Sequence, residues 1–228
     1  MSSFSKILTS YSKHPIQILD TSIPLEKYKP LDLSKGNSDL QYINITDSDA
    51  CEGYIRRMLK ETNGEVAYGG YLEQRNLYAD KAGFSANPAA QRNVHLGVDY
   101  WCDAGTKVIV PLTGTVHSFR NNDTIGDYGP TIILAHEALG YRFYTLYGHL
   151  SLNSLDGLEI GKRFEAGMQL GTLGTADINV NYAPHLHFQI IRDIQGYQGD
   201  YPGVCAQTDV DYYRQNCPDP NLLLKIGT

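Results

Sequence analysis

No stretch of the sequence approaches the roughly 20 consecutive apolar residues that a membrane-spanning helix needs, so we expect no membrane span. The N-terminal segment MSSFSKILTSYSKHPIQILD contains neither the apolar core nor the small-residue cleavage site of a secretory signal peptide. The sequence as it stands therefore predicts a cytoplasmic protein.

Cysteine is scarce: the 228 residues include four, Cys51, Cys102, Cys205 and Cys217, and no two have CxxC spacing. This number is too small for a disulfide framework. In a reducing compartment we expect free thiols, whereas Cys205 and Cys217 could pair in an oxidising one.

An excess of positive charge is also absent. The formal net charge is −6, which gives no electrostatic reason to expect nucleic acid or an anionic membrane as partner. Hydrophobic residues at 42% and charged residues at 19% are typical of a globular protein. The length suggests one domain, or one domain with a substantial extension.

The N-terminal part, to about residue 45, is expected to be irregular because prolines interrupt any helical pattern (Pro15, Pro24 and Pro30). A short helix is predicted over residues 50–60, capped by Asp47 or Ser48 and ended by Asn63-Gly64. Its apolar face (Tyr54, Met58 and Leu59) is expected to pack on the main domain.

From about Tyr68 onward, short runs rich in β-branched and aromatic residues alternate with Gly, Asn and Pro, which predicts strands joined by turns. The clearest runs are KVIVPL, GTVHSF, TIILAH, RFYTLYGHL, QLGTLG and HLHFQII. They indicate a mainly β, antiparallel, loop-rich domain.

Three fragments place polar residues in apolar surroundings. In the segment 93–100, strand alternation would put His95, Gly97 and Asp99 on one face, with Gly97 leaving room for something bound between the other two. In the segment 184–190, the same alternation places His185 and His187 together. The third fragment is Tyr147-Gly148-His149, where a strand gives way to a turn.

Two imidazoles and one carboxylate on rigid strands would form a three-ligand set with a fourth position for water, as in catalytic zinc sites. Such a set leaves a net charge of about +1 on the metal unit, which preserves Lewis acidity. The three fragments contain no cysteine, which favours hydrolysis over a structural zinc site. Ligation of this type favours zinc over manganese or cobalt.

The ordered motifs His95-Leu96-Gly97-Val98-Asp99, Tyr147-Gly148-His149 and His185-Leu186-His187 resemble those of the lysostaphin-type zinc endopeptidases, metallopeptidase family 23. Segments 114–116 and 165–174 also look like β-hairpin elements of that family. The resemblance covers about residues 90–192. HxxxD or HxH alone would be weak, but the ordered set is specific.

The resemblance implies that His95, Asp99 and His187 bind Zn²⁺, and that His149 and His185 are catalytic histidines without a metal bond. One would act as general base and both would stabilise the oxyanion. It also implies the fold: an antiparallel β-sheet groove domain, barrel-sandwich-like, with an irregular and helical N-terminal extension. The expected domains are the extension (1–67) with one short helix, and the metallopeptidase domain (68–228) with a C-terminal covering segment.

Four segments outside these motifs show a second, narrower resemblance. Segments 30–34, 128–134, 201–203 and 217–221 look like the peptidase module of bacterial proteins that join a kinase-like domain, this module and a pyridoxal-phosphate aminotransferase. The chain contains neither neighbour, so we expect a free-standing relative or an excised piece. Peptidoglycan bridges, the usual family substrate, lie outside the cytoplasm.

The leading expectation is a metalloendopeptidase acting on a peptidoglycan-like cross-bridge or another short peptide. Two alternatives stay open: a catalytically silent peptide- or peptidoglycan-binding module of the same fold, and a cytoplasmic amide hydrolase. A biotinyl- or lipoyl-type carrier is excluded, because neither GTVHSF nor MQLGTLG has a lysine at a hairpin tip. The remaining histidines (His14, His117 and His136) and the tyrosines of the strand runs (Tyr141, Tyr144 and Tyr147) are interpreted as structural.

Overall fold

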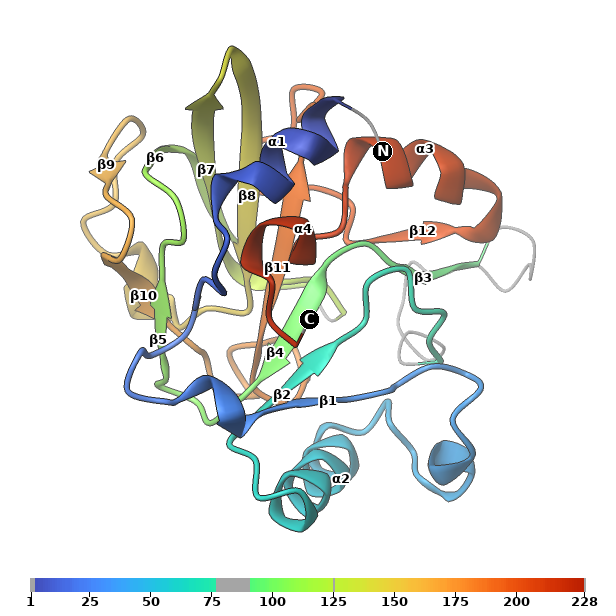
Figure 1. Cartoon of the computed structure of the whole chain (residues 1–228). Coiled ribbons are helices and arrows are strands. Elements are labelled where there is room, and N and C mark those ends of the chain that lie inside the picture. The colour runs from blue at the N-terminus through green and yellow to red at the C-terminus, as the bar shows by residue number, and fades with distance from the viewer. Residues whose placement is uncertain (1–2, 77–90, 125, 228) are drawn as a thin grey trace.

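The computed structural model describes residues 3–76, 91–124 and 126–227, and its centre is an eight-stranded sheet (Figure 1). The strand order is β1-β2-β4-β11-β8-β7-β6-β9. Its strands are β1 (Tyr28–Pro30), β2 (Val66–Gly69), β4 (Val98–Trp101), β6 (Gly114–Asn122), β7 (Gly129–Ala138), β8 (Tyr141–Gly148), β9 (Arg163–Phe164) and β11 (His185–Ile191). β1 and β2 pair in parallel, and the other neighbouring strands pair antiparallel.

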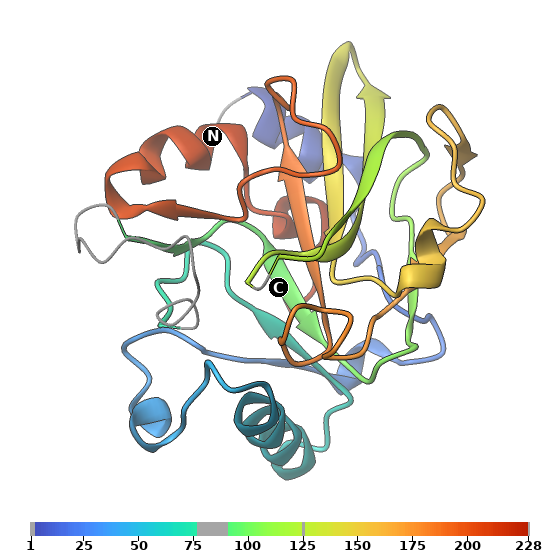
Figure 2. The same cartoon turned by 180° about the vertical axis from the view of Figure 1, so that it is seen from behind.

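Two small antiparallel sheets flank the large one. One joins β5 (Lys107–Ile109) to β10 (Gln169–Thr172), and the other joins β3 (Arg92–His95) to β12 (Val204–Ala206). The six runs that the sequence predicted as strands all form strands. The expected mainly β, antiparallel fold is therefore confirmed, and the β7–β8 hairpin projects beyond the rest of the sheet (Figures 1 and 2).

The helices are short and lie around the sheet. They are α1 (Ser3–Tyr11), α2 (Ser48–Glu61), α3 (Val210–Asn216) and α4 (Asn221–Leu224), with 3-10 turns η1 (Leu25–Lys27), η2 (Ser38–Tyr42), η3 (Leu152–Leu155) and η4 (Gln207–Asp209). Among the described residues, no helix combines the length and the apolar character that crossing a bilayer requires.

The expectation of an irregular segment up to residue 45 is wrong at its beginning, because α1 is a second helix of the extension. Phe4 and Leu8, one helical turn apart, are both buried, and the Phe4 ring lies 5.3 Å from that of Phe143. The three prolines all follow α1 in sequence, so they do not interrupt it. α1 packs beside α4 across one face of the sheet (Figure 1).

α2 forms where the sequence predicted a helix. Of the two candidate caps, Asp47 is the N-cap, and its carboxylate accepts a hydrogen bond of 2.8 Å from the Ala50 amide. Tyr54 and Ile55 are buried in a cluster that includes Trp101 of β4, with Met58 and Leu59 partly buried against it. The extension is thus attached to the sheet by α2 and by β1 and β2, which continue it.

The division at residues 67/68 remains a proposal, and residues 77–90 of the expected peptidase domain lie outside the described residues. Within that domain, the expectation of one continuous strand through residues 95–100 is wrong. β3 ends at His95 and β4 begins at Val98, because β3 pairs with β12 while β4 joins the large sheet.

Side-chain alternation along β11 separates the core from a polar face. Leu186, Phe188 and Ile190 point into the main hydrophobic core, which also receives Val98 and Tyr100 of β4. The residues between them on β11 therefore share the opposite face of the sheet, where the polar residues of interest lie.

Candidate metal centre

Strand β11 lies between β4 and β8, and its register places His187 opposite Asp99 on one side and Gly148 on the other. His149 directly follows Gly148, and His185 lies two residues before His187 on the same face. His95 enters from the end of β3. The fold thus brings together all five residues that the sequence singled out, from segments up to 92 residues apart.

Three of the five residues form a tight cluster of possible metal ligands. His95 Nε2 lies 3.2 Å from Asp99 Oδ1 and 2.9 Å from His187 Nδ1, and His187 Nδ1 lies 3.0 Å from Asp99 Oδ1. All three residues are buried, with 2 to 3% of each exposed. No other described group of three His, Cys, Asp or Glu residues lies close enough together to hold a metal ion.

Each imidazole of the cluster, His95 and His187, has an inner nitrogen that points into the cluster and an outer nitrogen that points away from it. Each outer nitrogen faces a carbonyl oxygen. His95 Nδ1 lies 2.9 Å from the Gly70 carbonyl, and His187 Nε2 lies 2.9 Å from Gln189 Oε1. The Gln189 amide nitrogen donates to the Pro202 carbonyl, which fixes Oε1 as the acceptor. Because a carbonyl oxygen only accepts, each outer nitrogen carries the proton, and both inner nitrogens present lone pairs.

The cluster therefore directs three acceptor atoms at one another, which repel unless a cation lies among them. Burial lowers the pKa of His95 to about 4, so this imidazole is neutral near pH 7. Burial acts to raise the pKa of Asp99, but the Arg75 guanidinium beside it holds that pKa well below its ordinary value. Ligands about 2.0–2.1 Å from a tetrahedral Zn²⁺ lie roughly 3.3 Å apart, close to the spacing here. The donor set fits a divalent metal.

His149 and His185 lie beside this cluster with their ring centroids 4.0 Å apart and their planes inclined by 35°. His185 Nδ1 donates to the Ala183 carbonyl at 2.7 Å, which leaves its Nε2 as a lone pair. His149 Nδ1 is buried and has no hydrogen-bond partner within the described part of the chain. Burial lowers the pKa of both imidazoles, and the proximity of His185 lowers that of His149 further.

The backbone of His149 adopts a left-handed conformation, with φ of +62°. Its amide donates to the Tyr128 carbonyl at 2.8 Å, and its carbonyl accepts from the Gly174 amide at 3.0 Å. These two bonds hold a conformation that L-residues rarely adopt. Such strain is typical of positions where a side chain is held for function.

The rings of two tyrosines also contact histidines of this site. The Tyr128 ring centroid lies 5.0 Å from that of His187 and 5.8 Å from that of His149, and the Tyr182 ring lies 5.5 Å from His149. Tyr147, in contrast, is fully buried in the core against Phe188, 5.3 Å between ring centroids, so its structural interpretation is confirmed.

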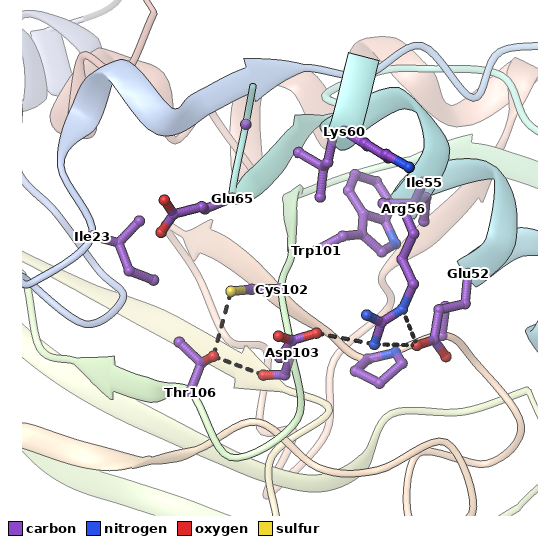
Figure 3. Close-up of a pocket in the computed structure, with 14 residues that line it drawn as sticks. Ile23, Glu52, Ile55, Arg56, Lys60, Glu65, Trp101, Cys102, Asp103 and Thr106 are labelled. Carbon is purple, nitrogen blue, oxygen red and sulfur yellow. Dashed lines mark hydrogen bonds and ion pairs between the residues drawn. The ribbon is translucent and has the colours of Figure 1, made fainter. Parts of the chain in front are cut away.

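Trp101 separates the site from a neighbouring pocket. Its ring stacks on His185 with 5.7 Å between centroids and 23° between planes. It also lines a pocket of about 410 Å³ between α2 and the β4–β5 turn, where Arg56 bridges Glu52 and Asp103 (Figure 3). Ala183 and Pro184, immediately before His185, line the same pocket.

Gly97 does not leave open space for a bound group between His95 and Asp99, as the sequence had suggested. A Cβ atom at this position would lie 2.6 Å from the Phe188 carbonyl oxygen and 2.7–2.8 Å from the His187 ring. The space that glycine leaves is therefore taken up by the His187 imidazole and the β11 backbone. Glycine is required here because the His187 ring packs directly on the chain between His95 and Asp99.

The sequence did not indicate three further residues that contact the clustered side chains. Gln189 lies on the same face of β11 as His185 and His187, so alternation could have found it. Gly70 and Arg75 lie in the segment after β2, and Arg75 contacts Asp99. Nothing local marks that segment as part of the site, because its contacts reach residues 24 and 25 positions away.

The site coincides with a region similar to known peptidases. Residues 93–200 match the family model described as Peptidase family M23. The resemblance to this family is confirmed. These residues include all five site residues, and the match supports a metallopeptidase as the class of activity.

Part of this chain is also similar to a bacterial protein. An uncharacterized metalloprotease of Haemophilus influenzae is 32% identical over 95 residues, which are 42% of this chain and 18% of the relative. The alignment thus spans less than a fifth of that relative's length.

Solved structures are also similar to parts of this chain. The catalytic domain of the antimicrobial peptidase lysostaphin from Staphylococcus simulans is 22% identical, covering 64% of this chain and 91% of that one, with a TM-score of 0.41. The catalytic domain of a mutant of the prophage-encoded M23 protein EnpA from Enterococcus faecalis is 21% identical, covering 50% and 81%, with a TM-score of 0.37.

Proposed function

We propose that this chain is a zinc-dependent metalloendopeptidase that hydrolyses peptide bonds, with His95, Asp99 and His187 as the zinc ligands. The proposal rests on the close approach of three acceptor atoms, which lie within 3.2 Å of one another: His95 Nε2, His187 Nδ1 and Asp99 Oδ1. A zinc ion there would supply Lewis acidity toward a peptide carbonyl.

The chain's own contribution to the chemistry comes from His149 and His185. Because burial lowers the pKa of both, they are neutral near pH 7, and one of them acts as general base. His185 presents its Nε2 lone pair, since its Nδ1 proton is held by the Ala183 carbonyl. Once protonated, the same groups donate hydrogen bonds to the negative charge that develops on the carbonyl oxygen.

The surrounding residues limit the contact of the five side chains with bulk solvent. The five side chains are at most 5% exposed, and the rings of Tyr128, Tyr182 and Trp101 pack against them. Low local polarity strengthens the interaction of each imidazole with developing charge. A short peptide, such as a peptidoglycan-like cross-bridge, is the proposed substrate class, and the peptidase family match supports it. A cytoplasmic location stays a prediction.

The test compares His149→Ala and His185→Ala with wild type on a panel of short peptides, glycine-containing cross-bridge peptides included, with zinc content measured in parallel. We expect both variants to keep zinc and to lose at least about 100-fold in kcat/KM, a typical contribution of general acid–base catalysis. His117→Ala is the matched control, because His117 is half-buried and bonded to Ser118 outside the site. Wild-type turnover in both variants would contradict their proposed role.

The same experiment separates the alternatives. A catalytically silent module would cleave none of the peptides, whether or not it binds zinc. An amide hydrolase would cleave small amide substrates but leave the longer peptides intact. Only cleavage of the longer peptides that depends on His149 or His185 supports the endopeptidase.

A further inference from the structure

Arg75 is a buried cation at the metal centre that comes from outside the matched peptidase region. Only 1% of the residue is exposed. Its Nη1 donates to Asp99 Oδ2 at 2.5 Å and its Nε donates to Glu73 Oε2 at 2.5 Å. The guanidinium carbon lies 5.3 Å from the centroid of the Trp101 ring, over its face.

The contact with Arg75 makes the two oxygens of Asp99 unequal. Oδ1 faces the inner nitrogens of His95 and His187, whereas Oδ2 accepts from the guanidinium. A carboxylate without such a partner can turn and offer both oxygens to a metal. Arg75 therefore holds Asp99 in the orientation in which one oxygen points at the ligand cluster.

Glu73 fixes the guanidinium in turn. Its Oε1 accepts from the Leu33 amide at 3.0 Å and its Oε2 accepts from Arg75, so both carboxylate oxygens are engaged. Its side chain is 12% exposed. The single positive charge of Arg75 is shared between two carboxylates, and its fork of N–H donors reaches both partners at once.

The backbone of the same segment orients His95. The Leu72 amide donates to the His95 carbonyl, the His95 amide donates to the Glu73 carbonyl, and the Arg75 amide donates to the Asn93 carbonyl, each at 2.9 Å. The segment 72–75 thus runs beside β3 as a hydrogen-bonded neighbour. One segment positions two of the three ligands.

Gly70, at the start of the segment 70–75, contacts the His95 side chain. Its carbonyl accepts from His95 Nδ1, and its φ is +104°. A Cβ atom there would clash with Arg75 Nη2 and lie 3.0 Å from His95 Nδ1. Only glycine lets the chain turn between the two side chains.

We propose that Arg75 is a positioning residue of the metal centre, which holds Asp99 through Oδ2 in the orientation that binds the metal and is itself held by Glu73. The segment 70–75 is therefore part of the site, although it lies before the matched region at 93–200. This inference rests on the proposed zinc site. Partners of metal ligands typically change metal affinity by about 10–100-fold when they are removed.

The experiment measures the affinity of the purified full chain for Zn²⁺ by competition with a chromophoric chelator, and the visible spectrum after loading with Co²⁺. The variants are Arg75→Met, Arg75→Lys and the double variant Glu73→Gln/Arg75→Met, which leaves no unpaired carboxylate at Glu73. Arg92→Met is the matched control, because Arg92 lies on the same strand as His95 and its guanidinium donates to the Val204 carbonyl of β12.

We expect Arg75→Met and the double variant to bind Zn²⁺ roughly 10–100-fold more weakly and to change the Co²⁺ spectrum. Arg75→Lys should fall between them and wild type, since lysine keeps the charge but not the fork, and Arg92→Met should match wild type. If Arg75→Met does not fold, the Zn²⁺ affinities of the double variant and of Arg75→Lys test the proposal instead. Unchanged affinity in folded Arg75 variants would show a role in stability alone.

Tighter zinc binding by the Arg75 variants would also overturn the proposal, because it would mean that the guanidinium competes with the metal for Asp99. Failure of the wild type itself to bind Zn²⁺ is a different result. It would reject the proposed metal centre as a whole, and with it the role of Arg75.

Discussion

The imidazoles of His149 and His185 lie against each other at a tilt of 35°, with ring centroids 4.0 Å apart. The first follows β8 in a left-handed conformation and the second opens β11, so the pair spans two adjacent strands. Two protonated imidazoles at this distance would repel strongly. The pair is therefore suited to hold one proton at a time, as a general base and its neighbour require.

The first prediction concerns the acid side of the pH–rate profile. Burial, and then the proximity of His185, lower the pKa of His149 well below the ordinary value of 6.5. A base with a lowered pKa stays neutral to lower pH, so kcat/KM should be maintained through pH 6.5 and fall only at more acidic pH. The profile of His117→Ala should coincide with it. A loss of activity with an apparent pKa at or above the ordinary histidine value would contradict this.

The second prediction concerns His136, which is buried away from the metal centre. Its Nδ1 donates to the Thr113 carbonyl, its Nε2 lies 2.7 Å from Thr145 Oγ1, and burial lowers its pKa to about 4. Below pH 6.5 the unfolded chain takes up a proton that the native chain does not. The free energy of unfolding should therefore fall by about 1.4 kcal/mol per pH unit between pH 6.5 and 4 from this residue.

The measurement for His136 is denaturant unfolding of wild type and His136→Gln across that range. Glutamine keeps a donor and an acceptor but does not titrate. The difference in stability between the two proteins should shrink as the pH falls from 6.5 to 4. A difference that stays constant with pH would show that His136 does not contribute in this way.

The third prediction is that Gly97→Ala damages the metal centre. The added methyl group would lie 2.7–2.8 Å from the His187 ring and 2.6 Å from the Phe188 carbonyl oxygen, so β11 or the ring must move. We expect a stability loss of about 1–3 kcal/mol and weaker zinc binding. Gly105→Ala is a control for a glycine with open space around it, although its own positive φ adds strain without touching the site. Zinc affinity equal to wild type in Gly97→Ala would contradict the packing described here.

The fourth prediction concerns Gln189, which fixes the proton of His187. Gln189→Leu removes the acceptor for His187 Nε2 and should weaken zinc binding by about 10–100-fold. Gln189→Glu keeps an acceptor for His187 but loses the donor to the Pro202 carbonyl, so it should bind zinc better than the leucine variant while losing stability. Equal affinities in the two variants would mean that the hydrogen bond to His187 has no effect.

The sequence predicts those features of the site that depend on neighbouring residues, and misses those that depend on contacts between distant segments. Alternation along β11 is a property of consecutive residues, so His185 and His187 could be placed on one face from the sequence, with Leu186 and Phe188 in the core. The same rule failed between His95 and Asp99. There the chain changes sheets at Leu96–Gly97, because β3 pairs with β12, more than 100 residues later.

The positioning residues were beyond sequence reasoning for the same reason. Arg75 and Glu73 appear in the sequence as ordinary charged residues in a polar segment. Only the fold shows that β2 pairs with β4 up to Gly69 and Asp99, so that the following residues reach His95 and Asp99. α1 was missed although Phe4 and Leu8 have helical spacing, because a single buried pair in nine residues is a weak pattern.

The central claim is that His95, Asp99 and His187 hold a zinc ion, and metal content tests it most directly. Wild type, His187→Ala and His149→Ala would be purified without chelator and analysed by mass spectrometry. The account predicts near-stoichiometric zinc in wild type and in His149→Ala, and none in His187→Ala. No metal in wild type even after zinc is added back, or equal zinc in His187→Ala, would contradict it.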